Sequence, residues 1–384
     1  MTKSLVKWKP RVKCRDGTQE PAPSSPLSVT MGRGRTASVG NEVANTTTSE
    51  VKSPTSAMSQ IDPIYSLKGK RVWVAGHHGM VGSALLRRLA QVDCTLLTVT
   101  RQDLDLARQA EVEAWMKDAR PQAVFMAAAK VGGIVANDRW PGQFLYDNLA
   151  IAANVIHAAE AAEVEKLLFL GSSCIYPRMA PQPINEGALL TAPLEPTNEW
   201  YAIAKIAGLK LCQAYRREYG CDFISAMPTN LYGPEDNFDL ATSHVIAALI
   251  RKAHEAKLYG DGKLVIWGSG APRREFLHVD DAADALVYLM THYSGSSHIN
   301  VGVGRDLTII ELAKLIAEVV GFSGQIVTDP TKPDGTPRKL LDTSKLAKLG
   351  WQPKIGLEEG LASTYKWFVS HVAPDQGERH ALRA

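Results

Sequence analysis

Short apolar runs alternate with stretches of helical periodicity from about residue 68 to residue 228. The apolar runs, four to six residues long, lie at residues 72–75, 95–100, 123–127, 166–170 and 222–227. Helical spacing of apolar residues follows the first run and covers residues 108–118, 146–162 and 201–219. Apolar strands that alternate with amphipathic helices predict βαβ units around a parallel sheet. We therefore expect an α/β fold of the Rossmann type, with a doubly wound parallel sheet.

The pattern loosens after Gly233-Pro234, where glycine, proline and isolated charges become more frequent. This change predicts a smaller and less regular C-terminal domain. We expect a first domain over residues 67–235, to which residues near 272–302 return, and a second, substrate-binding domain over most of residues 236–384. A body of this length can bury a core without disulfides or a structural metal.

Residues 1–66 show no apolar periodicity and are rich in serine, threonine, proline and glycine, which predicts a disordered extension. Its basic, serine-rich composition is also compatible with an organellar transit peptide, and Met31 and Met58 leave room for an overlong gene start. Nine basic and four acidic residues in positions 1–60 give this segment a charge of +5, whereas the whole chain carries +3. The body is therefore slightly acidic, and nucleic acid is not an expected partner.

Other classes of protein are disfavoured by simple features of the chain. No apolar run approaches the roughly 18 residues of a membrane span, and the N-terminus lacks the apolar core of a secretory signal. The five cysteines are widely spread without a CxxC pair, so neither a disulfide framework nor a metal site is predicted. We expect a cytoplasmic protein with reduced thiols.

Three glycines follow the first predicted strand and open a helix, in the run Gly76-His77-His78-Gly79-Met80-Val81-Gly82. In this context such glycines allow a sharp turn, close approach of a phosphate to the backbone, and tight helix–sheet packing. The pyrophosphate of a dinucleotide would lie at the helix N-terminus. Arg101 ends the second predicted strand, where NAD-selective sites carry an acid, and its charge favours the 2′-phosphate of NADP(H).

Tyr201 and Lys205 share one face of a predicted helix, because residues i and i+4 are neighbours there. A nearby ammonium group favours phenolate, so we expect Lys205 to lower the pKa of Tyr201, and Lys205 could also hold the nicotinamide ribose. Ser172 lies just past the strand at residues 166–170 and adds a hydroxyl donor. This set beside a dinucleotide suits hydride transfer to or from a carbonyl.

With these residues the sequence resembles the extended short-chain dehydrogenases/reductases that act on nucleotide sugars. Further motifs carry the resemblance over residues 68 to about 370: residues 127–137, 171–177, 195–199, 201–205, 227–234, 274–281 and 332–339. Within the family these motifs are similar to those of enzymes that convert GDP-4-dehydro-6-deoxy-D-mannose to GDP-L-fucose. The resemblance implies epimerisation at C3 and C5, followed by NADPH-dependent reduction at C4.

The resemblance also implies a role for each matching residue. Ser172 and Tyr201 would bind the C4 oxygen in all three steps, while Cys174 and His244 would act as base and acid on opposite faces of the sugar. The cofactor would contact the glycine turn, Lys205, His244 and two further groups, residues 101–106 (Arg101, Gln102, Asp103, Leu104, Asp105, Leu106) and the strand ends (Leu170, Gly171, Ser172, Ser173, Pro228, Thr229, Asn230, Leu231). The GDP-sugar would contact Lys252, Trp267, Arg274, Asp334 and Lys339. The relatives are expected to be homodimers that pair through the Tyr201 helix.

Two residues depart from the family pattern. His78 stands where some members have an arginine near the 2′-phosphate, which puts strict preference for NADPH in doubt. Lys252 stands where a phosphate-binding arginine is common, with Arg251 beside it, so either cation could bind the phosphates.

Three alternatives fit the residues less well. A 4,6-dehydratase needs an acid near position 172, where this chain has Ser-Ser-Cys, and a simple 4-epimerase needs neither Cys174 nor His244. Another nucleotide-sugar epimerase or 4-reductase of the same family stays open. A non-catalytic NADP-sensing module would be expected to have lost Tyr201 or Lys205, and both are present.

Overall fold

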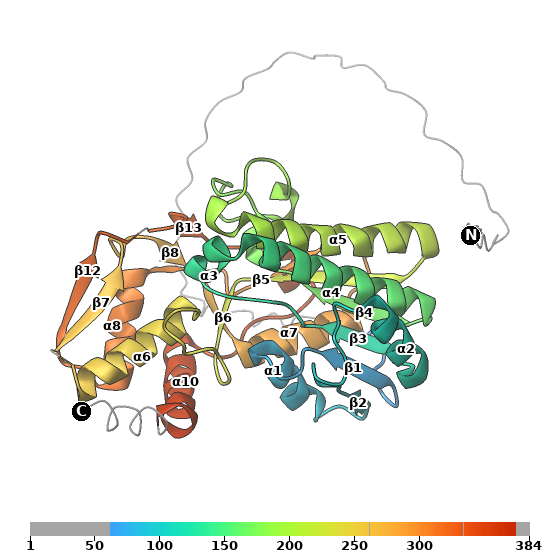
Figure 1. The fold of residues 1–384 in the computed structure, drawn as a ribbon, viewed down its shortest axis with the longest axis horizontal. Helices are drawn as coiled ribbons and strands as arrows, with labels where there is room; N and C mark the ends of the chain where they lie inside the picture. Colours follow the sequence, from blue (N-terminus) through green and yellow to red (C-terminus); the bar gives the residue numbers. More distant parts are fainter. Residues whose placement is uncertain (1–61, 261, 333, 374–384) are drawn as a thin grey trace, which may run out of the picture. The chain divides into compact units, whose positions relative to one another are not determined.

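The computed structural model describes residues 62–260, 262–332 and 334–373 (Figure 1). The expected disorder of the N-terminal extension therefore lies almost wholly outside the described residues. Its last residues form part of the body, because the backbone N–H groups of Ile64 and Tyr65 both donate to the carbonyl of Thr291. Ile64 and Tyr65 are therefore tied to the body, although both precede the boundary expected at residue 67.

A six-stranded sheet forms the centre of the body, and all of its strands are parallel. Their order is β10-β5-β4-β3-β1-β2. The bounds are β1 (Arg71–Ala75), β2 (Thr95–Leu97), β3 (Ala123–Met126), β4 (Lys166–Leu170), β5 (Asp222–Pro228) and β10 (Ile299–Val301). The chain reverses its direction across the sheet at β1 and β3, which is the doubly wound arrangement. The predicted Rossmann-type α/β fold is confirmed.

Helices cover both faces of this sheet (Figure 1). One face carries α1 (Met80–Leu89) and α7 (Val279–His292), which pack against each other. The other carries α2 (Gln109–Ala119), α4 (Pro141–Ala161) and α5 (Glu199–Tyr219). A short helix, α3 (Ile134–Arg139), precedes α4 and was not predicted from the sequence.

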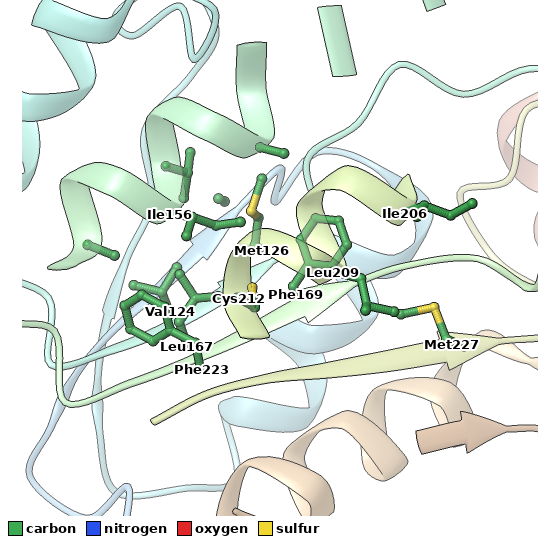
Figure 2. Close-up of a cluster of buried hydrophobic side chains, with 14 of the residues drawn as sticks. Val124, Met126, Ile156, Leu167, Phe169, Ile206, Leu209, Cys212, Phe223 and Met227 are labelled. Carbon is green, nitrogen blue, oxygen red and sulfur yellow. The ribbon is translucent and has the colours of Figure 1, made fainter. Parts of the chain in front are cut away.

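Alternate residues of the strands supply two separate cores, as the two-residue period of a strand requires. Val124, Met126, Leu167 and Phe169 face the side of α4 and α5, where Figure 2 shows them against Ile156, Leu209 and their neighbours. Phe125 and Leu168 belong to the core on the side of α1 and α7. Gly208 of α5 lies directly over the Phe169 ring, where a Cβ atom would overlap it. This contact sets the distance between α5 and β4.

The C-terminal part of the body is built from small sheets and a third core. β6 (Asn230–Tyr232) pairs with β9 (Phe276–His278), and β7 (Lys263–Trp267) pairs with β12 (Gln325–Asp329). β8 (Arg273–Arg274) lies between β11 (Leu307–Thr308) and β13 (Arg338–Lys339). The helices here are α6 (Val245–Leu258), α8 (Ile309–Val320) and α10 (Leu357–His371). The short α9 (Ser344–Lys348) packs instead beside β10, and its Leu346 belongs to the core under α1 and α7.

Most expected elements lie within a few residues of the observed ones. The largest difference is the start of α4 at Pro141, five residues before the expected residue 146. β2 ends at Leu97 instead of residue 100, since this edge strand is only half-buried and has one neighbour. β10 is an edge strand of the central sheet, and α7 packs against α1 on one face of that sheet. The division into a cofactor domain and a substrate domain stays a prediction.

Candidate functional site

A cavity of about 1010 Å³ lies at the carboxyl ends of β1, β3, β4 and β5. Segments that follow these strands line it, as do α5, the start of α6 and parts of β7, β8 and β13. Open parallel sheets bind ligands outside the carboxyl ends of their strands, near the point where the strand order reverses. The cavity is thus where this fold places its chemistry.

The glycine turn between β1 and α1 lines one end of the cavity. Gly76 has a φ of +87°, and a Cβ on it would lie 2.7 Å from the backbone of Ala128. A Cβ on Gly82 would overlap the carbonyl oxygen of Gly76. Gly79, by contrast, has no described protein atom closer than 3.6 Å to such a Cβ, so packing does not require glycine there. A free approach to the N-terminus of α1 fits a bound pyrophosphate.

Residues 101–106, which follow β2, were expected to contact the adenosine end of the cofactor, and only some of them line the cavity. Arg101, Leu104, Asp105 and Leu106 line the cavity, and Arg101 is exposed with no ion pair among the described residues. Gln102 and Asp103 do not line it, because both side chains are exposed and Asp103 accepts a hydrogen bond from Thr100 Oγ1. The rings of His77 and His78 contact each other at the cavity, with centroids 3.9 Å apart and planes tilted by 40°.

The predicted hydride-transfer residues meet in the middle of the cavity. Ser172 caps the short 3-10 helix η1 (Ser173–Ile175), accepting from the N–H of Cys174 at 3.3 Å. Lys205 Nζ lies 5.7 Å from the ring centroid of Tyr201 and donates to the carbonyl of Leu170 at 2.8 Å. The strand end and the helix face therefore present hydroxyl, thiol, phenol and ammonium groups to one space.

One expectation about these groups is wrong in direction. Burial raises the pKa of Tyr201, and the nearby Cys174 adds to the rise, so Lys205 does not bring the phenol towards ionisation. Lys205 donates a hydrogen bond to the Leu170 carbonyl, and burial lowers the pKa of this lysine to about 8. A neutral phenol is the form that can donate a proton, which is what reduction of a ketone needs.

Cys174 and His244 lie on different segments of the cavity wall, the loop after β4 and the start of α6. Burial raises the pKa of the Cys174 thiol, and Lys339 is the largest influence in the opposite direction. His244 is exposed towards the cavity that it lines, and the surrounding protein partly desolvates its ring and so lowers its pKa. Two proton-exchanging groups thus border the same space as Tyr201.

The predicted substrate residues line the other end of the cavity. Trp267 is 44% exposed, and Lys252 Nζ lies 5.0 Å above its ring. Asp334 accepts from the N–H of Ser269 at 2.7 Å and from its hydroxyl at 2.9 Å, so it also organises the turn after Trp267. Arg251 does not line the cavity and pairs with Glu255 at 2.7 Å. Of the two adjacent cations, Lys252 is therefore the one presented to a ligand.

Glu275 is a functional residue that sequence reasoning missed, although it lies within a quoted motif. It is fully buried, and its carboxylate accepts from the N–H groups of Val303 at 2.6 Å, Gly304 at 2.8 Å and Leu341 at 2.9 Å. These bonds join the strand of Arg274 to the segment that carries Lys339. Glu275 thereby positions both cations, and its sequence neighbours alone do not show this.

Five side chains with an unpaired polar atom at the cavity were also missed. In the described part of the chain, the buried atoms without a hydrogen-bond partner are Trp73 Nε1, Asn137 Oδ1, Asn198 Oδ1, Asp236 Oδ2 and Ser243 Oγ. All five residues line the cavity. Such orphaned atoms are rare in native proteins, and a ligand commonly supplies the partner.

Two negative findings apply to the described residues. No group of three or more histidine, cysteine or acidic side chains is arranged to hold a metal ion. None of the described helices combines the length and apolar character needed to cross a bilayer.

Comparison with known proteins gives one family. The model of the NAD-dependent epimerase/dehydratase family matches residues 72–302. A GDP-L-fucose synthase of Sinorhizobium fredii is 63% identical over 311 residues, which are 81% of this chain and 99% of the relative. GDP-L-fucose synthase 1 of Arabidopsis thaliana is 59% identical (79% and 95% covered), and the Escherichia coli enzyme 55% identical (79% and 97%).

Solved structures agree with this result. A GDP-L-fucose synthetase from Naegleria fowleri bound to NADP has a TM-score of 0.75 at 28% identity, covering 81% of this chain and 98% of its own. A GDP-D-glycero-L-gluco-heptose synthase from Campylobacter jejuni, solved in the presence of NADPH, has a TM-score of 0.72 at 35% identity, covering 80% and 100%.

Proposed function

Because the chain belongs to the NAD-dependent epimerase/dehydratase family, we propose that it catalyses the reaction of its GDP-L-fucose synthase relatives. The substrate is GDP-4-dehydro-6-deoxy-D-mannose, and the product is GDP-L-fucose. The observation that carries the proposal is the meeting of Ser172, Cys174, Tyr201 and His244 in one cavity beside a dinucleotide-type glycine turn.

The ketone at C4 makes this chemistry possible, because it acidifies the C–H groups at C3 and C5. Hydrogen bonds from Ser172 and Tyr201 to the C4 oxygen would stabilise the negative charge that develops when either proton leaves. The same two donors would stabilise the alkoxide of the later reduction. One oxyanion site therefore serves both epimerisations and the reduction.

Each epimerisation removes a proton from one face of the sugar and returns one to the other. Cys174 and His244 supply these two roles, with the thiol as the base and the histidine as the acid. Lys339 favours the thiolate, since it is the largest influence that lowers the pKa of Cys174. The low pKa of His244 means that it passes its proton on readily.

Bound NADPH supplies the hydride for C4. The glycine turn and Arg101 would hold its phosphates, and Lys205 would hold the nicotinamide ribose. Tyr201 donates the proton to the C4 oxygen, for which its raised pKa keeps it in the neutral form. Lys252, Arg274 and Lys339 would bind the pyrophosphate of the GDP-sugar.

One assay tests the proposal directly. Purified protein is supplied with NADPH and GDP-4-dehydro-6-deoxy-D-mannose, the loss of NADPH absorbance is followed, and the product is identified by NMR. GDP-L-fucose is the expected product. A reduced sugar with unchanged C3 and C5 would remove the epimerase half of the proposal, and NADPH binding without oxidation would support a sensing module instead.

Preference for NADPH can be tested at Arg101. An Arg101→Ala variant is expected to raise the KM for NADPH by about tenfold or more, since a charge-assisted contact to the 2′-phosphate is lost, and to leave the KM for NADH unchanged. Arg108 offers a matched comparison, because it is also exposed at the cavity. If Arg108→Ala gave the NADPH-specific loss and Arg101→Ala did not, the assignment of Arg101 would be wrong.

We also propose that the enzyme is a cytoplasmic homodimer that pairs through α4 and α5. Exposed apolar side chains on these neighbouring helices support the interface: Tyr146 of α4, 68% exposed, and Trp200 and Ile203 of α5. A monomeric mass in sedimentation equilibrium would exclude the dimer.

A further inference from the structure

Three of the orphaned polar atoms lie close together at one edge of the cavity, next to His244. They are Asn137 Oδ1, Asp236 Oδ2 and Ser243 Oγ, and none has a hydrogen-bond partner within the described residues. Leaving such an atom buried and unpaired destabilises a folded protein. Three such atoms on one wall indicate a binding surface whose partners come from a ligand.

Asn137 is held in place by its amide nitrogen. Its side chain is 6% exposed, and Nδ2 donates to the carbonyls of Gly132 at 2.7 Å and Gly133 at 3.0 Å. These bonds use both amide hydrogens and fix the rotamer at the start of α3. The amide oxygen is then left as an acceptor that no described part of the protein uses.

The other two atoms belong to one loop, whose internal bonds bring them near each other. Asn237 Nδ2 donates to Thr242 Oγ1 at 2.8 Å. Asp236 precedes the donor residue and Ser243 follows the acceptor residue, so this hydrogen bond holds the two ends of the loop together. Asp236 uses only one carboxylate oxygen, which accepts from the N–H of Asn237 at 2.7 Å. The second oxygen has no described partner.

The loop and α3 are also joined to each other. The N–H of Gly133 donates to the carbonyl of Thr242 at 2.9 Å, and a Cβ on Gly133 would lie 2.8 Å from the carbonyl oxygen of Ser243. This close approach brings the Asn137 side of the wall against the Asp236–Ser243 side. His244 follows directly and begins α6.

The chemistry of these atoms selects the ligand group. An amide oxygen and a carboxylate oxygen accept hydrogen bonds, and a serine hydroxyl accepts or donates. Such a set repels phosphates and suits hydroxyl groups. The neighbouring His244, together with Cys174 and Tyr201, defines the part of the cavity where the hexose reacts.

We propose that Asn137, Asp236 and Ser243 form a subsite that binds the hydroxyl groups of the substrate's hexose. The subsite rests on the proposed function, because it assumes a GDP-hexose whose C4 lies at Ser172 and Tyr201. It gives the enzyme a means to select a hydroxylated hexose and to hold the ring while protons are exchanged at C3 and C5. A site built to bond a hydroxyl discriminates strongly against a sugar that lacks it.

Binding of GDP-mannose to the full-length protein tests the subsite without catalysis. This sugar nucleotide carries hexose hydroxyls but no ketone. Asp236→Asn replaces the free oxygen by an N–H donor, and Ser243→Ala removes the hydroxyl. Burial raises the pKa of Asp236 to about 7, so titration calorimetry at pH 8 keeps its carboxylate ionised. We expect each variant to bind GDP-mannose about tenfold more weakly than the unchanged protein does, and to keep the same affinities for GDP and NADPH.

Asp239→Asn is the matched control, because it makes the same change in the same loop. Asp239 is exposed, does not line the cavity, and accepts from the N–H groups of Ala241 and Thr242. The Asp239→Asn variant should bind GDP-mannose with the same affinity as the unchanged protein. For the Asp236→Asn and Ser243→Ala variants, an unchanged affinity for NADPH shows that they are folded.

Each of the other outcomes would contradict the proposed subsite. An equal loss of affinity for GDP would mean that these atoms bind the nucleotide part of the substrate. A loss of affinity for NADPH would mean that they bind the cofactor. Unchanged binding of GDP-mannose in both variants would show that the atoms bind no sugar hydroxyl. Failure of the proposed function is read separately, as absence of turnover by the unchanged protein.

Discussion

A Tyr201→Phe variant is expected to reduce the C4 ketone at least about a thousandfold more slowly than the unchanged enzyme, while its affinity for NADPH stays the same. In the proposed mechanism the phenol is both a donor to the C4 oxygen and the source of the proton that completes reduction, and removal of either contribution typically slows a reaction by about two to four powers of ten. The variant removes one oxygen and keeps the ring that packs edge-on against Phe144. NADPH oxidation under saturating substrate measures the effect.

Tyr259→Phe is the matched control for this experiment. Tyr259 directly follows α6, lies outside the cavity lining and is 56% exposed. Its loss of a phenol oxygen should leave reduction within about twofold of the unchanged rate, the range expected of exposed substitutions. If Tyr201→Phe still reduced the ketone at a tenth of the normal rate, another group would have to be the proton donor.

A Cys174→Ser variant is expected to separate the two activities. Exchange of the C3 and C5 protons with deuterated water should fall by about a hundredfold or more, because a serine hydroxyl is a far weaker acid than a thiol and does not form the basic anion. Reduction should continue, because Ser172 and Tyr201 are unchanged. NMR of the reduced product should then show a sugar that kept its original configuration at C3 and C5.

Cys94→Ser controls for the general effect of replacing a thiol. Cys94 is half-buried, lies outside the cavity lining, and should not alter proton exchange when it is changed. Full exchange in the Cys174→Ser protein would assign the base to another residue. Loss of both exchange and reduction, with normal NADPH binding, would mean that Cys174 instead helps to orient the sugar.

Much of the fold follows from local pattern, since buried parallel strands are short apolar runs that few other elements resemble. β4 was predicted to the residue at both ends, and Ser172 and Tyr201 could be brought together because each belongs to a motif next to a predictable element. β2 was predicted too long because residues 98–100 are typical strand residues, whereas the pairing of β2 with β1 ends at Leu97 and Trp73.

What could not be predicted depends on the surroundings of a side chain in three dimensions. The pKa of Tyr201 rises because the phenol is buried, and the sequence shows only that a lysine lies four residues away. The unpaired oxygens of Asn137 and Asp236 become visible only when every possible partner has been placed. Glu275 likewise resembles an ordinary surface acid until its three backbone donors, from two distant segments, are known.

The contact between Gly208 and Phe169 links a residue without a side chain to the reaction at C4. Ser172 and Cys174 follow β4, the strand that contains Phe169, whereas Tyr201 and Lys205 belong to α5, the helix that contains Gly208. The ring and the bare backbone act as a spacer between the two halves of the catalytic machinery. A single methyl group added at Gly208 would therefore alter the geometry of proton and hydride delivery from a position that never touches substrate.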